Sequence, residues 1–491
     1  MEQLQLFPSA PILIESTRSI GYSFESAIAD IVDNSISAGA TSITIEFEAQ
    51  DSPFVAIIDD GHGMNRQDLI AAMKYGSQSS LSARSKTDLG RFGLGLKVAS
   101  LSQCRKLCVL TKTKDSKLIG ASWDLDVIEQ TQDWILLILS EQEVNDKLTK
   151  LRVDNLNQGT IVVWEEFDRI SNTSIDTTKI IIEKMDNVSK HLSLVFHKYM
   201  SQDYSKNTLN IEVNGVKLKA TDPFLIHHPS TQPKSIETLT IENQKIYVRP
   251  HILPHAKKLT NANKVTLGKV DDYRTNQGFY VYRNKRLIIW GTWFKLFKQN
   301  ELTNLARVSV EIPNSLDHIW EIDVKKSTAT LPDIIRKKLQ AVTSASIEGS
   351  EKVYRYRGRK EKNESIQNVW DVVTNNGKFT YRINRETEIF KVIESMIPDK
   401  NITLFHNFMT LLEEQFPYAD VYYRYSKNMG DLEEPKQDQE GVYLMAKSII
   451  DTLKESNKSI LAFMKGIQTT APFKDYPEVI KRIHLEESYE K

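Results

Sequence analysis

The chain of 491 residues contains few cysteines, no excess of either charge and no long apolar run. Its two cysteines, Cys104 and Cys108, cannot form a disulfide framework, and without a second pair they do not make a zinc site. We therefore expect them to pack in a core, in a reducing, cytoplasmic compartment. No window reaches the ~18 apolar residues of a membrane-spanning helix, and residues 1–16 lack the basic and apolar regions of a signal peptide. No membrane association is expected, and the densest apolar run, 134–139, predicts a buried strand.

Charge is balanced, because lysine plus arginine (64) equals aspartate plus glutamate (64). This excludes a protein that binds nucleic acid through bulk positive charge, although local basic patches remain open. A hydrophobic share of 40% is typical of globular proteins. The length corresponds to about three domains.

Hydrophobic spacing predicts a mixed α/β region in the N-terminal part. Apolar residues at spacings of three and four from Phe24 to Ala38 predict an amphipathic helix, which Gly39 ends. A helix at 98–102 is also expected, and β-branched runs predict strands at 41–47, 54–58, 106–113, 135–139 and 160–165.

A second α/β region is expected after a helical stretch near 180–199. Its clearest element is the hairpin Gly278–Trp290, which turns at Asn284-Lys285. Other predicted strands are 209–213, 245–248, 306–312 and 320–327, followed by a helix from Pro332 to Leu339. We predict domains at 1–200 and 201–348, a charged linker at 349–365, and a mostly helical region at 366–491 with a loop at 428–441.

Two motifs place polar side chains or glycines where a nucleotide could bind. Asp30 and Asn34 lie four residues apart on the first helix, with Asp33 beside them, so oxygen ligands for Mg²⁺ share one face. In Asp59-x-Gly61-x-Gly63 a carboxylate at a strand end suits an exocyclic amine, and the glycines allow a flat ligand to approach closely. Taken singly, each also fits a purely structural role, a polar helix face or a glycine turn.

A third motif, Gly90-x-x-Gly93-x-Gly95 with Lys97, could wrap a triphosphate with its backbone amides or form a flexible surface loop. It is not a Walker loop, because Leu96 separates Gly95 from Lys97 and Val98 replaces the expected serine or threonine, and it is not G-x-G-x-x-G. The polar segment 76–85 before it is interpreted as a mobile lid. Gly159-Thr160 then enters a strand.

The order and spacing of these signals resemble the GHKL ATPases, the family of DNA gyrase, the ninety-kilodalton heat-shock chaperone, histidine kinases and MutL. The resemblance covers about residues 22–165 and is carried by ADIVDNSISAGA, IDDGHGM and GRFGLGLK. It implies an α+β two-layer, Bergerat-type ATP-binding domain at 1–200. The wording is most similar to the MORC and MutL branch, including bacterial relatives associated with restriction or anti-phage defence.

The resemblance implies a role for each matching residue. Asn34 would hold Mg²⁺, Asp59 would accept a hydrogen bond from the adenine amino group, and Thr160 would support the adenine. Asp30 stands where the family usually has its general-base glutamate, and its side chain is one methylene shorter. The resemblance therefore implies ATP binding more directly than it implies hydrolysis. The other residues assigned to ATP are Asp33, Ala38, Gly61, Gly63 and Met64, and the phosphate-wrapping lid is Gly90, Arg91, Phe92, Gly93, Leu94, Gly95, Leu96 and Lys97.

In the MutL, gyrase and MORC branches a second, transducer domain supplies a lysine that reaches the γ-phosphate. The run 320–327 resembles that loop, which predicts Lys326, with Lys325 as the alternative, as a catalytic lysine in a transducer-like domain at 201–348. The structural alternative is two solvated surface lysines.

The resulting hypothesis is a switch that binds Mg²⁺ and ATP, forms an ATP-dependent homodimer, and acts on DNA or on a nuclease- or helicase-type partner. Hydrolysis to ADP and phosphate would reset it. The alternatives are a nucleotide-gated scaffold with little hydrolysis and a protein chaperone, which the absence of a long charged linker between the first two regions disfavours. The run Tyr354–Lys360 fits either contact with nucleic acid or a solvated linker.

Overall fold

The computed structural model divides into two compact units, residues 1–354 and 355–491, which are considered separately. Within the described ranges, each helix is too short or too polar to cross a membrane. The structure describes residues 3, 8–19, 21–75, 95–154, 156–170, 177–255, 258–260, 263, 275–299, 303–317, 320, 331, 335–344, 347, 368–375, 378–418, 420–421, 438–470 and 472–489.

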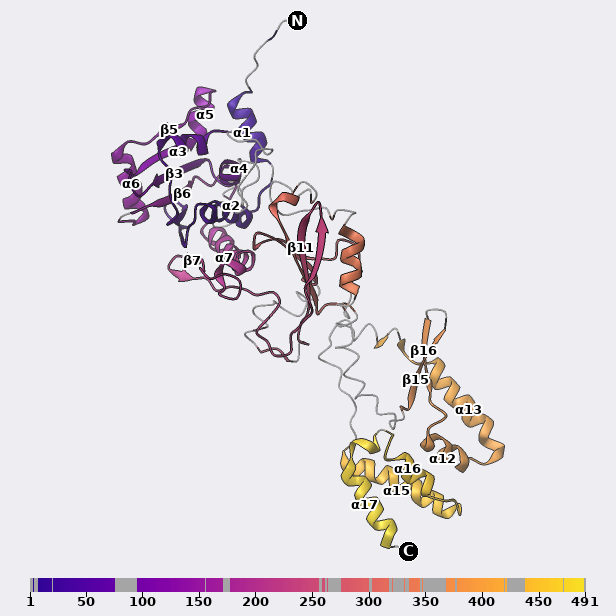
Figure 1. Cartoon of the computed structure of the whole chain (residues 1–491). Coiled ribbons are helices and arrows are strands. Elements are labelled where there is room, and N and C mark those ends of the chain that lie inside the picture. Colours follow the sequence, from indigo (N-terminus) through magenta and orange to yellow (C-terminus); the bar gives the residue numbers. More distant parts are fainter. Residues whose placement is uncertain are drawn as a thin grey trace. The chain divides into compact units, whose positions relative to one another are not determined.

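The first unit begins with an eight-stranded mixed sheet in the order β5-β4-β3-β6-β2-β1-β7-β8 (Figure 1). Neighbouring strands are antiparallel except β1 and β7, which run parallel. The strands are β1 (Ser42–Glu48), β2 (Phe54–Asp59), β3 (Lys106–Lys112), β4 (Ile119–Asp124), β5 (Leu137–Ile138), β6 (Gly159–Glu165), β7 (Asn210–Val213) and β8 (Val216–Lys217).

Helices cover this sheet on one face, and a further helix packs on the other. Val55 and Ile57 of β2 point into the core that contains α2 (Phe24–Ser37) and α7 (Thr177–Val195), whereas Ala56 points to the opposite side, against α6 (Glu141–Leu151). The central strands are thus buried on both faces, which confirms the mixed α/β prediction. The remaining helices here are α1 (Ala10–Arg18), α3 (Arg66–Met73), α4 (Gly95–Leu101), α5 (Leu125–Thr131) and α8 (His197–Met200).

One apolar run behaves differently from its prediction. Residues 134–139 were expected to form a buried strand, but only β5 (Leu137–Ile138) pairs with β4, and Ile138 is 40% exposed. Because β5 lies at the edge of the sheet, only part of its surface is covered. Cys104 and Cys108 are both free and buried, as predicted, and burial raises the pKa of Cys108 to about 12.

A second, six-stranded sheet in the first unit has the order β10-β11-β14-β12-β13, with β9 pairing β11. The predicted hairpin is confirmed, since Asn284 and Lys285 join β12 to β13 with φ of 48° and 68°, as a primed turn requires. The strands are β9 (Gln232–Pro233), β10 (Glu237–Ile241), β11 (Gln244–Ile252), β12 (Gly278–Arg283), β13 (Arg286–Thr292) and β14 (Ala306–Ile312), followed by the short 3-10 helix η2 (Asn314–Leu316).

The two faces of this hairpin belong to different cores. Tyr280, Tyr282 and Leu287 join the core of the first sheet, whereas Phe279 and Val281 pack in a second core with the helical residues 335–344. The first and second sheets are therefore packed against each other through the hairpin.

The second unit combines a two-stranded sheet with helices, consistent with the mostly helical prediction. The predicted end of the loop at 428–441 is wrong, because Asp438 caps a helix that starts at Gln439. The predicted linker 349–365 lies outside the described residues. The elements are β15 (Trp370–Asn375), β16 (Lys378–Ile383), α12 (Glu388–Met396), α13 (Asp399–Glu414), α15 (Gln439–Glu455), α16 (Leu461–Gly466), η3 (Phe473–Asp475) and α17 (Pro477–Tyr489).

Candidate nucleotide site

Helix α2 brings three of the predicted site residues together. Ser23 caps its N-terminus by accepting a hydrogen bond from the Ser26 amide, and its apolar face is buried against the sheet. Asp30 and Asp33 are buried, whereas Asn34 is exposed. Polar residues close together on this helix therefore differ in their exposure to solvent.

Asp30 lies beside the start of α4. Its Oδ2 accepts a hydrogen bond of 2.9 Å from the Tyr22 hydroxyl, and a Cβ atom built on Gly95 would lie 3.9 Å from the same oxygen. The carboxylate is thus adjacent to the end of the glycine-rich run. Tyr22, which sequence reasoning missed, orients it.

Asp33 is held by a residue of the second sheet. Both of its carboxylate oxygens accept hydrogen bonds from Nε of Arg286, at 3.2 and 3.1 Å. The structure therefore places this predicted ATP-binding residue in a buried ion pair with β13. Nothing in the spacing of the motif indicated that partner.

The Asp59 carboxylate is buried at the end of β2 and joins three segments. Oδ1 accepts from the amides of Gly61 (3.0 Å) and Thr160 (3.2 Å), and Oδ2 accepts from the Ser35 hydroxyl (2.7 Å). Burial raises the pKa of Asp59, while these hydrogen bonds act in the opposite direction. All of these donors are neutral, and because a carboxylate has about four lone-pair sites, a further donor such as an amine can be accepted.

The surroundings of Asp59 are narrow and built from small groups. A Cβ atom at Gly61 would lie 2.9 Å from the Ala38 Cβ, and one at Gly63, where φ is +66°, would lie 2.0 Å from the Lys112 carbonyl oxygen. Side chains larger than hydrogen therefore do not fit at either position. The structure thus brings Ala38 and Gly61 beside the Asp59 carboxylate, while Gly63 packs closely against the backbone of Lys112.

Thr111 completes this region and was not predicted. Its hydroxyl accepts from the Met64 amide (2.9 Å), donates to the Gly159 carbonyl (3.0 Å) and lies 3.1 Å from the Thr160 hydroxyl. Thr111 pairs with Thr160 across β3 and β6. Only the strand register brings these two threonines together, so the sequence offered no direct signal.

Part of the predicted phosphate-wrapping run begins α4. Leu96 packs against the core, and the buried Lys97 donates from Nζ to the Ala72 carbonyl at 2.8 Å. Burial lowers the pKa of Lys97 to about 8. The other members of the run, Gly90, Arg91, Phe92, Gly93 and Leu94, lie outside the described residues, as do Lys325 and Lys326.

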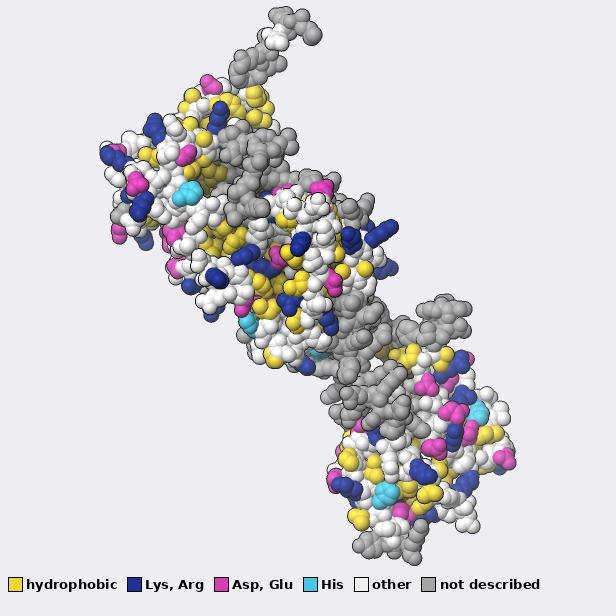
Figure 2. Space-filling view, in the orientation of Figure 1, with side chains coloured by type: hydrophobic (Ala, Val, Ile, Leu, Met, Phe, Trp, Pro, Cys, Tyr) yellow, Lys and Arg dark blue, Asp and Glu magenta, His cyan; other side chains and the backbone are white. Residues whose placement is uncertain are grey.

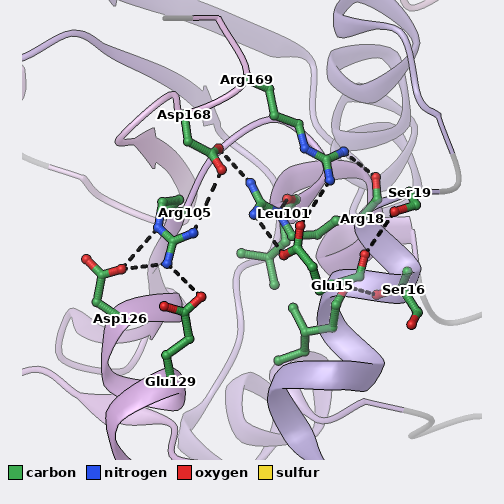
Figure 3. A network of polar contacts seen from close by, with 12 residues as sticks. Glu15, Ser16, Arg18, Ser19, Leu101, Arg105, Asp126, Glu129, Asp168 and Arg169 are labelled. Carbon is green, nitrogen blue, oxygen red and sulfur yellow. Dashed lines mark hydrogen bonds and ion pairs between the residues drawn. The ribbon is translucent and has the colours of Figure 1, made fainter. Parts of the chain in front are cut away.

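The other end of α4 is held by Arg18 of α1 (Figure 3). The buried Arg18 guanidinium donates to the Leu101 carbonyl (2.6 Å) and to Asp168 (2.6 Å), and it pairs with Glu15 (3.0 Å). Arg105 extends the network from Asp168 to Asp126. The helix that starts at Gly95 is thus fixed at its C-terminus by charged hydrogen bonds.

These residues suit an adenine nucleotide with Mg²⁺. The buried Asp59 carboxylate has neutral hydrogen-bond donors and lies beside Ala38 and Gly61, and helix α2 carries the exposed amide of Asn34. Mg²⁺ needs few protein ligands when phosphates supply the others. Among the described residues, no group of three or more His, Cys, Asp or Glu side chains is arranged to hold a metal.

Comparison with known families identifies this part of the chain. Residues 22–160 match the family described as histidine kinase-, DNA gyrase B- and HSP90-like ATPase. This match confirms the resemblance of the region to the GHKL ATPases that the motifs predicted.

Individual relatives agree with the predicted branch. ATPase morc-1 of Caenorhabditis elegans is 28% identical over 228 residues, which is 39% of this chain and 26% of that protein. The DNA mismatch repair protein MutL of Dictyoglomus turgidum is 30% identical over 115 residues, 22% of this chain and 19% of its own length. MutL of Pelobacter propionicus is 37% identical over 87 residues, which is 16% of this chain and 14% of that protein. The chain thus spans 26% or less of these relatives.

The close approach at Gly63 is testable by comparison with Gly39, another glycine of positive φ. Gly39→Ala meets no atom within 4 Å and should lower the free energy of unfolding by about 1–2 kcal/mol, the cost of the left-handed backbone alone. Gly63→Ala also collides with the Lys112 carbonyl, so we expect a loss larger by about 1–3 kcal/mol. Urea unfolding measures both, and equal losses would contradict the close approach.

The Arg18 network is testable by Arg18→Met. We expect the free energy of unfolding to fall by about 2–3 kcal/mol, less than for a fully buried pair because Asp168 is partly exposed. As a control, Lys190→Met removes an exposed pair with Asp186 and should cost less than about 1 kcal/mol. Thermal unfolding of both variants measures these losses. If Arg18→Met loses no more free energy of unfolding than Lys190→Met, a role of Arg18 in fixing α4 is contradicted.

Proposed function

We propose that this protein is an ATP-binding, ATP-hydrolysing conformational switch. The observation that carries the proposal is the buried Asp59 carboxylate, which accepts hydrogen bonds from neutral donors and lies beside Ala38 and Gly61. Such an acceptor distinguishes an adenine amino group from a carbonyl oxygen, because only the amine donates. Membership of residues 22–160 in a family of ATPases supports the same conclusion.

At the phosphate end, Asn34 and Asp30 have complementary roles. The exposed Asn34 side chain would bind Mg²⁺, which would neutralise charge on the phosphate oxygens. Asp30, oriented by the Tyr22 hydroxyl, would take a proton from the attacking water as a general base. Lys326, or Lys325 in its place, would stabilise negative charge on the γ-phosphate.

The proposal extends to what the switch controls. ATP must bind the closed, paired form better than the open monomer if it is to drive dimerisation. One group of relatives carries the name DNA mismatch repair protein, so DNA or a nuclease- or helicase-type partner is the proposed target, with restriction or anti-phage defence as the proposed setting. On the face drawn in Figure 2, basic side chains of the described residues are interspersed with acidic ones, so binding to DNA must be measured directly.

Asp59→Asn tests the adenine contact. Removing the charged acceptor should weaken ADP binding about 10- to 100-fold, since a hydrogen bond to a charged group contributes about 1.5–3 kcal/mol. Because the pKa of Asp59 is raised by burial, binding by the wild type should also weaken as the pH falls toward that pKa, at a higher pH than for an exposed aspartate. Calorimetric titration of ADP across pH measures both effects.

Asp60→Asn is the matched control for this experiment. Asp60 is the adjacent carboxylate, but it accepts hydrogen bonds from Thr41 and Ser42 and shares none of the side-chain or amide donors of Asp59. Its variant should bind ADP as the wild type does. Equal effects of the two substitutions, or a pH profile unchanged in Asp59→Asn, would contradict the assignment.

Steady-state phosphate release from Mg²⁺ and ATP, with and without DNA, tests the reaction. Asp30→Asn should retain ATP binding and lose about 100-fold or more in kcat, as expected for a general base. Asn34→Ala should lose the Mg²⁺ dependence of binding and should reveal any contaminating ATPase. Asp60→Asn serves again as the control.

The outcomes separate the alternatives. Turnover that disappears in Asn34→Ala and responds to DNA supports the switch acting on nucleic acid. Nucleotide binding without turnover supports the scaffold, and a rise in phosphate release in Asp30→Glu would show that the shorter carboxylate is poorly placed. Suppression of client aggregation that is insensitive to DNA would instead support a chaperone.

A further inference from the structure

We infer that Arg286 is a positioning residue for the nucleotide site, which fixes helix α2 from the second sheet through Asp33. The inference rests on the proposed ATP-binding function. It concerns a residue 253 positions away from Asp33 in the chain, on an element with no glycine-rich or acidic motif. We therefore infer that the second sheet determines where Asn34 and Asp30 lie.

The pair is buried and well oriented. Arg286 and Asp33 side chains are 5% and 1% exposed, and Nε lies 3.2 and 3.1 Å from the two carboxylate oxygens. The guanidinium also donates from Nη1 to the Leu287 carbonyl (2.7 Å) and lies 5.4 Å from the centre of the Phe196 ring. These additional partners hold the planar guanidinium, so its orientation toward Asp33 of α2 is fixed.

The contacts around the pair tie the hairpin to the first sheet. The Trp290 ring lies 5.8 Å from His191 of α7, and the Tyr199 hydroxyl donates to the Asn284 carbonyl in the hairpin turn. Tyr282 and Leu287 belong to the core of the first sheet. The hairpin therefore cannot shift without disturbing α7 and Asp33 together.

Helix geometry carries this restraint to the nucleotide site. Asp33 faces the hairpin, while Asn34 is the next residue and Asp30 lies almost one turn earlier, beside Gly95. A hydrogen-bonded helix moves as a unit, so fixing one turn fixes both neighbours. By linkage, a nucleotide that prefers one placement of α2 also favours the corresponding placement of the hairpin.

The same hairpin contains a matched control. Arg283 forms a comparable ion pair with Asp317 at 2.8 Å, with side chains 7% and 14% exposed. Both partners belong to the second-sheet region, and neither contacts α2 in this pair. Loss of this pair disturbs the hairpin without touching Asp33.

The test compares Arg286→Met, Arg286→Lys and Arg283→Met in the full chain. Misplaced reacting groups lower the rate sharply, so Arg286→Met should reduce kcat about 10- to 100-fold, while KM for ATP changes by less than about threefold. Arg286→Lys should recover part of kcat, because a cation still faces Asp33. Arg283→Met should keep wild-type kcat even where its unfolding midpoint falls equally.

Hydrogen exchange of the α2 amides provides a readout that does not require nucleotide. Exchange at residues 31–37 should accelerate in Arg286→Met and stay at the wild-type rate in Arg283→Met. If Arg286→Met does not fold, the neutral pair Asp33→Asn with Arg286→Met replaces it, since replacing both members of a buried pair is often tolerated. That double variant should show the same loss of kcat and the same faster exchange.

The possible failures are distinguishable. If the wild type binds no ATP, the proposed function is wrong, and unchanged α2 exchange in Arg286→Met would overturn the positioning role separately. If the wild type binds and hydrolyses ATP but Arg286→Met and Arg283→Met have equal kcat, the inference is wrong while the proposed function stands.

Discussion

Burial of the Asp59 carboxylate is the constraint on which the geometry of the site depends. A charge removed from water must be compensated by hydrogen bonds, and here the donors come from α2, from the turn after β2 and from β6. Meeting this requirement brings together segments that are 24 and 101 residues distant in the chain. The same burial leaves an acceptor whose hydrogen-bond donors are neutral, and this supports the proposal that the carboxylate selects an amine.

Helix α2 links this acceptor to the rest of the first unit. Ser35 bonds to Asp59, Asp33 bonds to Arg286, and Asp30 bonds to Tyr22. One helix therefore contacts Asp59, the second sheet and Tyr22. A ligand that moves this helix acts on all three, so the switch proposed here needs no additional moving part.

Much of the fold and of the region around Asp59 could be predicted from local pattern. The helix at 24–37, the strand ending at Asp59 and the hairpin turning at Asn284-Lys285 follow from hydrophobic period and turn chemistry, which act over a few residues. Residues 134–139 were mispredicted as buried because an apolar run does not reveal that its strand lies at a sheet edge. The roles of Ser35, Thr111 and Tyr22 depend on packing and register, and no spacing rule indicates them.

By itself, the sequence determined which chemical groups are available and in what order. The carboxylates of α2, the Asp59 turn and the glycine-rich run are local features, and their order indicated the ATPase family that residues 22–160 match. The tertiary structure alone decided what each carboxylate faces: neutral donors for Asp59, a tyrosine hydroxyl for Asp30 and Arg286 for Asp33. The reason is that hydrogen bonds between distant segments depend on strand register and core packing, which only the folded chain defines.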